Sequence, residues 1–144
     1  MINNVYEIGN RGEIEEWKTV EDFPDYEASN TGCIRSKTRR IRQNKGDTIY
    51  ERTMKGKIIK PSLSKTGYCL VWLRKDNKKS YAVTVHRIVA KAFLGYSELD
   101  VNHKDGNKMN NSITNLEYVT RSENIKHAYR VLHRKHWTEY ETNK

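Results

Sequence analysis

An asparagine-rich polar block between two short apolar segments is the feature that most constrains the fold of this chain. Residues 104–115 are almost wholly polar, and five asparagines lie in or next to them: Asn102, Asn107, Asn110, Asn111 and Asn115. The flanking residues 100–103 and 116–119 have the composition of short strands, and residues 120–123 carry a capping box that opens a helix. The order strand, polar loop, strand and helix is therefore predicted over residues 100–133.

Two side chains in this arrangement have the chemistry of a phosphodiester-cleaving site. His103 closes the first predicted strand, and Asn124 falls in the first turn of the helix. They can meet because the strands are antiparallel and the helix packs back across them. A histidine can take a proton from water near neutral pH. Amide oxygens can hold hard cations such as Mg²⁺, although more weakly than carboxylates because they carry no charge.

Patterns of apolar residues upstream predict antiparallel hairpins and one further helix. Phe23 to Tyr26 is expected to be a loop because proline fixes φ, and Asn30-Thr31-Gly32 is expected to be a tight turn. Residues 1–15 show no firm periodicity and are expected to form an arm or a short helix. The remaining expected elements are strands at 16–20, 33–36, 67–73 and 80–85, a helix over 86–94 that ends at Gly95, and a final helix with a buried stripe of Ile125, Ala128, Tyr129 and Leu132.

The charge distribution predicts a polyanionic partner. The formal net charge is +9, and it is uneven: residues 1–30 hold eight acids and two bases, whereas residues 35–65 hold eleven bases and two acids. We therefore expect a phosphate backbone to lie against the middle of the chain. A membrane partner is not expected, because no apolar run approaches the roughly 18 residues that a spanning helix needs.

The N-terminal residues and the cysteines predict a cytoplasmic protein, which would lie in the cytoplasm of the host cell if the chain is phage-encoded. Met1 to Asn10 lack the basic segment and apolar run of a secretory signal. Cys33 and Cys69 form no Cys-x-x-Cys pair, so we expect two reduced, buried thiols rather than a structural zinc site.

Four segments carry a recognisable pattern: Val101 to Asn111, Thr114 to Thr120, Glu123-Asn124 and the upstream Thr84 to Phe93. They closely resemble the HNH endonucleases, in particular the phage and intron-encoded homing nucleases that share a ββα-metal (His-Me finger) site. Another segment, Trp17 to Ser36, resembles a small DNA-binding module often found at the front of such nucleases. The resemblance covers about residues 16–133.

This resemblance implies a role for four residues of the polar block and the helix that follows it. His103 matches the general base, and Asn115 matches the central asparagine that pins the loop and helps to orient the base. Asn102 and Asn124 match metal ligands, with one Mg²⁺ or Mn²⁺ per active site. Some members carry aspartate at the position of Asn102, so asparagine removes one negative charge from the implied site.

The resemblance also implies an organisation and a partner. An N-terminal arm over 1–15 would precede a β-hairpin DNA-binding module with a basic loop over 16–60, an HNH nuclease core over 61–136 and a tail over 137–144. The expected partner is double-stranded DNA, without any small-molecule cofactor. The basic residues expected to contact it are Arg35, Lys37, Arg39, Arg40, Arg42, Lys57, Lys60 and Lys65.

The function implied is a divalent-metal-dependent DNA endonuclease of the homing type that nicks or breaks DNA with a histidine base. The alternatives are a catalytically idle HNH fold that only binds DNA, and a protein that binds or cleaves RNA. Residues 37–57 are expected to be a flexible loop or a two-stranded ribbon. Other residues are expected to play no direct part in catalysis: His86 is expected to be structural and His127 solvent-facing. The strand aromatics Tyr26, Tyr68 and Trp72 are expected to lie in the core rather than to stack on bases.

Overall fold

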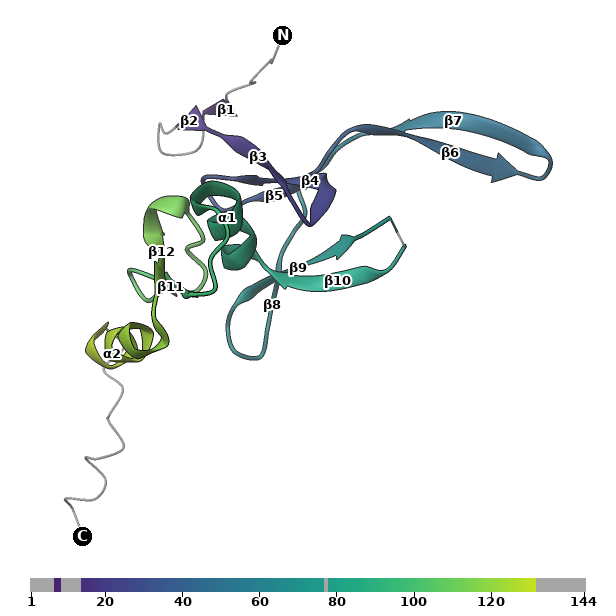
Figure 1. Ribbon diagram of the computed structural model, residues 1–144. Coiled ribbons are helices and arrows are strands. Elements are labelled where there is room, and N and C mark those ends of the chain that lie inside the picture. Colours follow the sequence, from purple (N-terminus) through teal and green to yellow (C-terminus); the bar gives the residue numbers. More distant parts are fainter. Residues whose placement is uncertain (1–6, 9–13, 77, 132–144) are drawn as a thin grey trace.

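The computed structural model describes residues 7–8, 14–76 and 78–131, and these form an α+β fold of small antiparallel sheets and two helices. In Figure 1, helix α1 (Val85–Leu94) lies near the middle of the molecule. A long two-stranded ribbon extends to one side, and helix α2 (Arg121–Val131) lies on the other. The expected tail over 137–144 lies outside the described residues.

The first sheet confirms the hairpin predicted around the Asn30-Thr31-Gly32 turn. Strands β3 (Trp17–Val20), β4 (Phe23–Ser29) and β5 (Ile34–Ser36) form it in the order β3-β4-β5. Gly32 has a φ of 93°, which favours glycine. Ahead of this sheet, β1 (Glu7–Ile8) pairs with β2 (Ile14–Glu15), so the described part of the expected arm is a strand pair and not a helix.

The expectation of a loop over Phe23 to Tyr26 is wrong, because β4 begins at Phe23. The pairing of β4 with β5 covers only Tyr26 to Ala28, and the β3–β4 register shifts between Thr19 and Val20. Pro24 therefore lies outside the regular pairing on both sides, where its missing N–H is not needed.

The basic segment forms a two-stranded ribbon, which was one of its two expected forms. Strands β6 (Arg39–Lys45) and β7 (Thr48–Met54) pair along their full length, from Arg39 opposite Met54 to Lys45 opposite Thr48. The ribbon projects away from the rest of the chain (Figure 1), and every residue of β7 is exposed. Its stability as a hairpin thus depends on cross-strand pairs and not on a core.

The predicted second hairpin is confirmed as β9 (Cys69–Arg74) paired with β10 (Ser80–Thr84), with β8 (Ser62–Leu63) at the other edge of β9. Helix α1 follows β10 directly and ends at Gly95, whose φ is 85°. Its buried face meets apolar residues of both sheets in one core. The buried members of this core are Val20, Phe23, Tyr26, Ala28, Ile34, Cys69, Val71, Leu73, Val85, Ile88, Val89, Ala90 and Leu116.

The predicted strand, loop, strand and helix order is present at the end of the chain. Strands β11 (Asp100–His103) and β12 (Leu116–Val119) are antiparallel, with His103 opposite Leu116, and a short 3₁₀ turn, η1 (Ile113–Asn115), precedes β12. The capping box is confirmed: the Thr120 N–H donates to Glu123 Oε2 at 2.8 Å, and the Glu123 N–H donates to Thr120 Oγ1 at 3.3 Å.

Three expectations about burial are wrong. No described residue of α2 is buried, and Ile125 is 48% exposed, because this helix packs mainly along β11 rather than into the core. Leu132 lies outside the described residues. Trp72 is 61% exposed, since its strand position faces away from the core side that Val71 and Leu73 occupy. Cys33 is exposed as well, whereas Cys69 is buried as expected. Among the described residues no helix is long and apolar enough to cross a membrane.

Candidate active site

The structure brings His103, Asn102 and Asn124 together around one cavity of about 220 Å³. His103 and Asn102 are neighbours on β11 and are 5% and 7% exposed. Asn124 reaches the cavity from the first turn of α2, whose start is fixed by the Thr120 cap and by the Asn124 N–H donating to the Thr120 carbonyl at 2.9 Å. Other residues that line this cavity are Tyr68, Lys108 and His127.

The proton on the His103 ring is placed by Asn111, a residue to which sequence reasoning gave no role. Asn111 Nδ2 donates to the Met109 carbonyl at 3.2 Å, so its Oδ1 is the atom that lies 3.1 Å from His103 Nε2. Because Oδ1 only accepts hydrogen bonds, Nε2 carries the proton. In the neutral ring, Nδ1 is then the nitrogen with a lone pair, which is the atom able to take a proton from water.

Both proposed metal ligands have their amide nitrogen turned toward a carboxylate. Asn102 Nδ2 donates to Glu117 Oε1 at 2.9 Å, and Asn124 Nδ2 lies 3.5 Å from Asp100 Oδ2. The amide oxygens of Asn102 and Asn124 are therefore left to accept a cation or a hydrogen bond. The two carboxylates also bring negative charge next to a pair of neutral ligands.

Asn115 ends the 3₁₀ turn η1, and its side chain holds together the loop that follows His103. Its Oδ1 accepts from the Asp105 N–H at 3.1 Å, and its Nδ2 donates to Asp105 Oδ1 and to the Asn110 carbonyl, each at 2.9 Å. Desolvation acts to raise the pKa of Asp105, but hydrogen bonds from Asn110, Asn107 and Asn115 outweigh it and hold that pKa below its ordinary value. The loop is thus tied around an ionised carboxylate.

His86 lies against the proposed base, although sequence reasoning took it for an ordinary structural residue. Its ring centroid is 5.1 Å from that of His103 and 4.9 Å from that of Tyr68. Burial, followed by the positive charges of His103 and Arg87, lowers the pKa of His86 to about 4. His86 is therefore neutral near pH 7 and packs beside His103 without adding charge. The only sequence signal for this contact was its place at the start of a helix.

His127 is half-buried beside the same cavity and is not simply solvent-facing as expected. Its Nε2 lies 3.0 Å from the carbonyl oxygen of Lys104, the residue after His103. Because a carbonyl can only accept, Nε2 donates and is not free to bind a cation.

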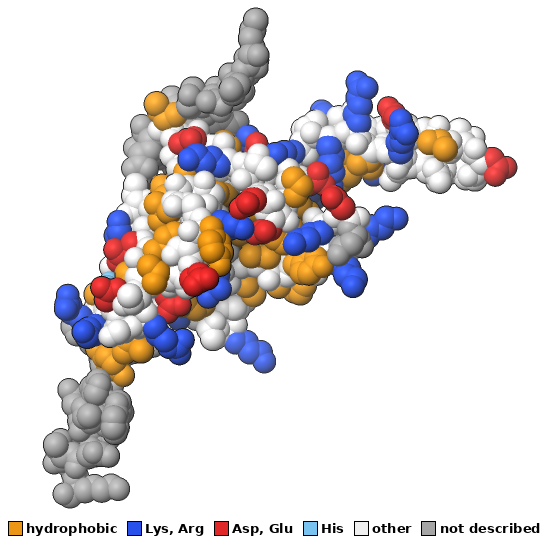
Figure 2. Space-filling view, in the orientation of Figure 1, with side chains coloured by type: hydrophobic (Ala, Val, Ile, Leu, Met, Phe, Trp, Pro, Cys, Tyr) orange, Lys and Arg blue, Asp and Glu red, His pale blue; other side chains and the backbone are white. Residues whose placement is uncertain are grey.

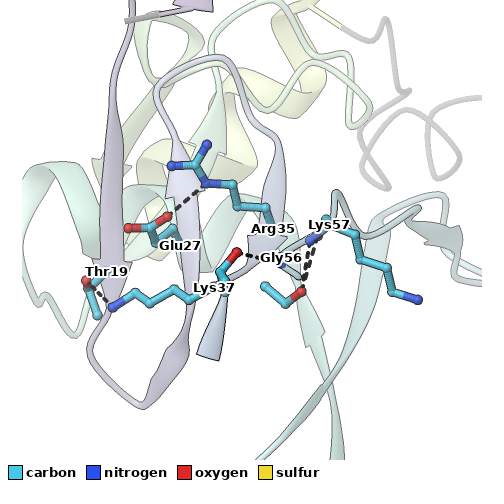
Figure 3. Close-up of polar contacts among 8 residues, drawn as sticks. Thr19, Glu27, Arg35, Lys37, Gly56 and Lys57 are labelled. Atoms are coloured by element: carbon cyan, nitrogen blue, oxygen red, sulfur yellow. Dashed lines mark hydrogen bonds and ion pairs between the residues drawn. The ribbon is translucent and has the colours of Figure 1, made fainter. Parts of the chain in front are cut away.

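Two of the basic residues expected to contact DNA are engaged within the protein. Arg35 Nε donates to Glu27 Oε2 at 2.8 Å, and its guanidinium lies 4.0 Å from the centre of the Trp17 ring. Lys37 Nζ donates to Thr19 Oγ1 at 2.7 Å. Figure 3 shows both side chains folded back onto the first sheet, whereas the side chain of Lys57 extends away from it.

The other basic residues expected at the DNA lie on or near the ribbon. Arg39 and Arg42 form ion pairs with Asp25 at 3.3 Å and Glu51 at 2.9 Å, and Arg40 is exposed. Figure 2 shows Lys and Arg side chains spread along the ribbon with acidic ones among them. The remaining three, all exposed, follow the ribbon in sequence: Lys57, Lys60 and Lys65.

A buried histidine on an antiparallel strand pair, followed by a helix that brings an amide oxygen to the same cavity, defines a ββα class of site. Comparison with known protein families supports this class. Residues 15–74 match the model of the NUMOD4 motif, and residues 83–126 match the model described as HNH endonuclease. The chain therefore carries an HNH endonuclease motif with a NUMOD4 motif ahead of it.

Relatives and one solved structure are similar over most of the chain. DNA endonuclease I-HmuI of Bacillus phage SP01 is 38% identical over 113 residues, which are 76% of this chain and 55% of that protein. An uncharacterised HNH endonuclease of Acanthamoeba polyphaga mimivirus is 37% identical over 117 residues, 80% of this chain and 30% of that protein. A solved chain of the homing endonuclease I-HmuI, from work on its DNA binding and cleavage, matches with a TM-score of 0.67 and 34% identity, covering 88% of this chain and 65% of that one. This chain thus spans less than two thirds of these proteins.

Proposed function

We propose that this chain is a divalent-metal-dependent DNA endonuclease of the homing type that hydrolyses phosphodiester bonds with His103 as the general base. The observation that carries this proposal is the single cavity lined by His103, Asn102 and Asn124. The HNH endonuclease motif and the similarity to I-HmuI support DNA as the substrate. In this proposal residues 16–60 form the DNA-binding module and residues 61–136 the nuclease core.

The base chemistry follows from the tautomer that Asn111 imposes. With the proton on Nε2, His103 Nδ1 takes a proton from the water whose oxygen attacks the scissile phosphorus. A new phosphorus–oxygen bond forms as the bond to the 3′-oxygen breaks. Asn115 supports this step only at a distance, because it closes the loop that continues from His103.

The residues present fit a hard divalent cation. Oxygen atoms are the donors that Mg²⁺ and Mn²⁺ prefer. Because the amide nitrogens of Asn102 and Asn124 face the carboxylates of Glu117 and Asp100, their amide oxygens point the other way and can act as ligands. When bound, the cation supplies charge stabilisation to the scissile phosphate and the leaving oxygen. Because both ligands are neutral, we expect weak binding, with Mn²⁺ supporting cleavage at least as well as Mg²⁺.

Cleavage of supercoiled plasmid is the experiment that tests this function. We expect conversion to nicked or linear DNA in Mg²⁺ or Mn²⁺ and none in excess EDTA. Cleavage that persists in EDTA would contradict the metal-dependent mechanism. DNA binding without cleavage in the presence of either metal would instead support a catalytically idle HNH fold. Preferential cleavage of an RNA of matched sequence would show that the substrate is RNA rather than DNA.

We further propose that the β6–β7 ribbon tracks the DNA backbone. The support is its projection from the body and its run of exposed basic side chains. Arg39 and Arg42 would exchange their carboxylate partners for phosphates. That exchange costs little, because exposed ion pairs contribute at most about 1 kcal/mol.

Replacing Arg39, Arg40 and Arg42 together with alanine is expected to weaken DNA binding and to flatten its salt dependence. Each lost phosphate contact should remove about 0.9 from the slope of log K against log salt concentration. Binding measured by anisotropy over a range of salt concentrations gives this slope. Lysine at the same three positions is the control, because it keeps the charge. If the alanine variant retains both affinity and slope, the ribbon does not lie along the backbone.

A further inference from the structure

The contact between the first sheet and the catalytic loop joins two segments that are far apart in the sequence. The turn at residues 30–32 connects β4 to β5, in the part of the chain that matches the NUMOD4 motif. It lies directly against residues 111–113, in the part that matches the HNH model. The Ile113 N–H donates to the Asn30 carbonyl at 2.9 Å, and Ser112 Oγ donates to the same oxygen at 3.3 Å.

Gly32 makes the closest approach in this contact. A Cβ atom at position 32 would lie 2.7 Å from the backbone carbon of Asn111 and 2.8 Å from its carbonyl oxygen. Those distances are too short for a side chain, and the atoms in the way are backbone. Only glycine therefore lets the turn pack against Asn111, and Asn111 is the residue that holds His103 Nε2.

The turn is itself held on its far side, so it can act as a fixed support. Ser29 is fully buried, and its Oγ accepts from the Cys33 N–H at 3.0 Å. Asn30 Oδ1 accepts from the Glu16 N–H at 2.9 Å, and Asn30 Nδ2 donates to the Ile14 carbonyl at 3.0 Å. Hydrogen bonds thus join residues 14 and 16 to the turn, and the turn to Ser112 and Ile113. Gly32 packs against the neighbouring Asn111, whose side chain contacts the His103 ring.

We propose that the turn over residues 30–32 is a positioning element for the general base, and that Gly32 and Asn111 are its positioning residues. This inference rests on the proposed role of His103. Its consequence is that the NUMOD4 part does more than contact DNA, because it sets the placement and tautomer of the base in the HNH part. A displacement of the order of 1 Å at a catalytic group can cost about 100-fold in rate.

Gly32→Ala is the variant that tests the proposal, with Gly95→Ala as its matched control. Gly95 has a φ of 85°, close to that of Gly32, but a Cβ there would meet nothing within 4 Å. Both variants strain the backbone, and only Gly32→Ala pushes on Asn111. We expect Gly32→Ala to lower kcat by about 10–100-fold, with unchanged DNA affinity, and Gly95→Ala to stay near the wild-type rate.

A spectroscopic measurement keeps the test independent of cleavage. Ring ¹⁵N shifts of His103 at pH 8 should show the Nε2-protonated form in the wild type and in Gly95→Ala, and a mixture of tautomers in Gly32→Ala. If the wild type does not cleave DNA, the proposed function fails, yet the shifts still report whether the turn positions the ring. A wild-type kcat and an unchanged tautomer in folded Gly32→Ala would overturn the inference.

Asn30→Ala is the second variant, in case Gly32→Ala does not fold. It removes the two side-chain bonds that anchor the turn, but it leaves Gly32 and the Asn30 carbonyl in place. We expect a smaller loss of kcat than in Gly32→Ala, together with partial mixing of the His103 tautomers. Unchanged values of both in Asn30→Ala and in Asn111→Ala would reject the positioning role by a route that does not depend on the glycine.

Discussion

Replacing His103 with alanine is expected to lower the rate of DNA cleavage by roughly 10²–10⁴, the usual loss when a general base is removed. The Nδ1 atom that would take the proton from water is lost. The two nearby histidines are held in other ways: His127 Nε2 donates to the Lys104 carbonyl, and the His86 ring packs against that of His103. Single-turnover cleavage of a defined DNA substrate measures this rate.

DNA affinity should change little in the same variant, because His103 is only 5% exposed. His127→Ala is a useful comparison, since it removes a histidine from the same cavity but not the proposed base. Its loss of rate should be much smaller. Cleavage by His103→Ala at close to the wild-type rate would contradict the assignment of His103 as the general base. A loss of both DNA binding and cleavage would indicate damage to the fold.

Replacing Asn124 with alanine is expected to raise the metal concentration needed for half-maximal cleavage by on the order of 10–100-fold, a range typical of groups that support a bound metal. The helix start fixes the backbone of Asn124 beside the cavity, so its loss removes an oxygen donor from a set position. Titrations of cleavage with Mg²⁺ and Mn²⁺ give this concentration. Calorimetric titration of Mn²⁺ without DNA gives a second measurement that does not require cleavage.

Asn102→Asp tests the other ligand position from the opposite direction, because it adds a charged oxygen donor. The structure shows why this single substitution is expected to lower the metal requirement only in part. The new carboxylate would face Glu117, which now accepts a hydrogen bond from the Asn102 amide at 2.9 Å, and two like charges so close disfavour each other. Combining it with Glu117→Gln restores a donor, so the double variant should need the least metal.

The two titrations separate the ligands from each other. An unchanged metal requirement in Asn124→Ala would remove Asn124 from the ligand set while leaving the rest of the mechanism standing. A higher requirement in the Asn102→Asp, Glu117→Gln double variant than in the wild type would place Asn102 outside the set.

Local sequence patterns were sufficient for most of the secondary structure and for the frame of the site. Short alternating segments predicted β9, β10, β11 and β12, and the capping box predicted the start of α2. His103 and Asn124 lie at the strand end and in the first helical turn where the sequence put them. These features are encoded by neighbouring residues, because caps, turns and strand alternation depend on contacts within a few positions.

The sequence was less informative where burial depends on what another element covers. Trp72 and Ile125 have the composition of core residues, yet no described element packs over them and both are exposed. Pro24 suggested a loop, but a strand can include a proline where the pairing on both sides is already interrupted. In each of these cases a local preference was outweighed by the arrangement of neighbouring strands and helices.

By itself, the sequence determined the order of most elements and the resemblance to HNH endonucleases, and it led to the proposal of His103 as base and of Asn102 and Asn124 as metal ligands. Only the tertiary structure decided which atoms act on one another. It placed Asn111 rather than Asn115 against His103, His86 beside the same ring, and Gly32 against the backbone that carries Asn111. The physical reason is that these contacts join residues that are distant in the sequence, since Gly32 and Asn111 are 79 positions apart. Such contacts leave no periodic pattern in a single sequence.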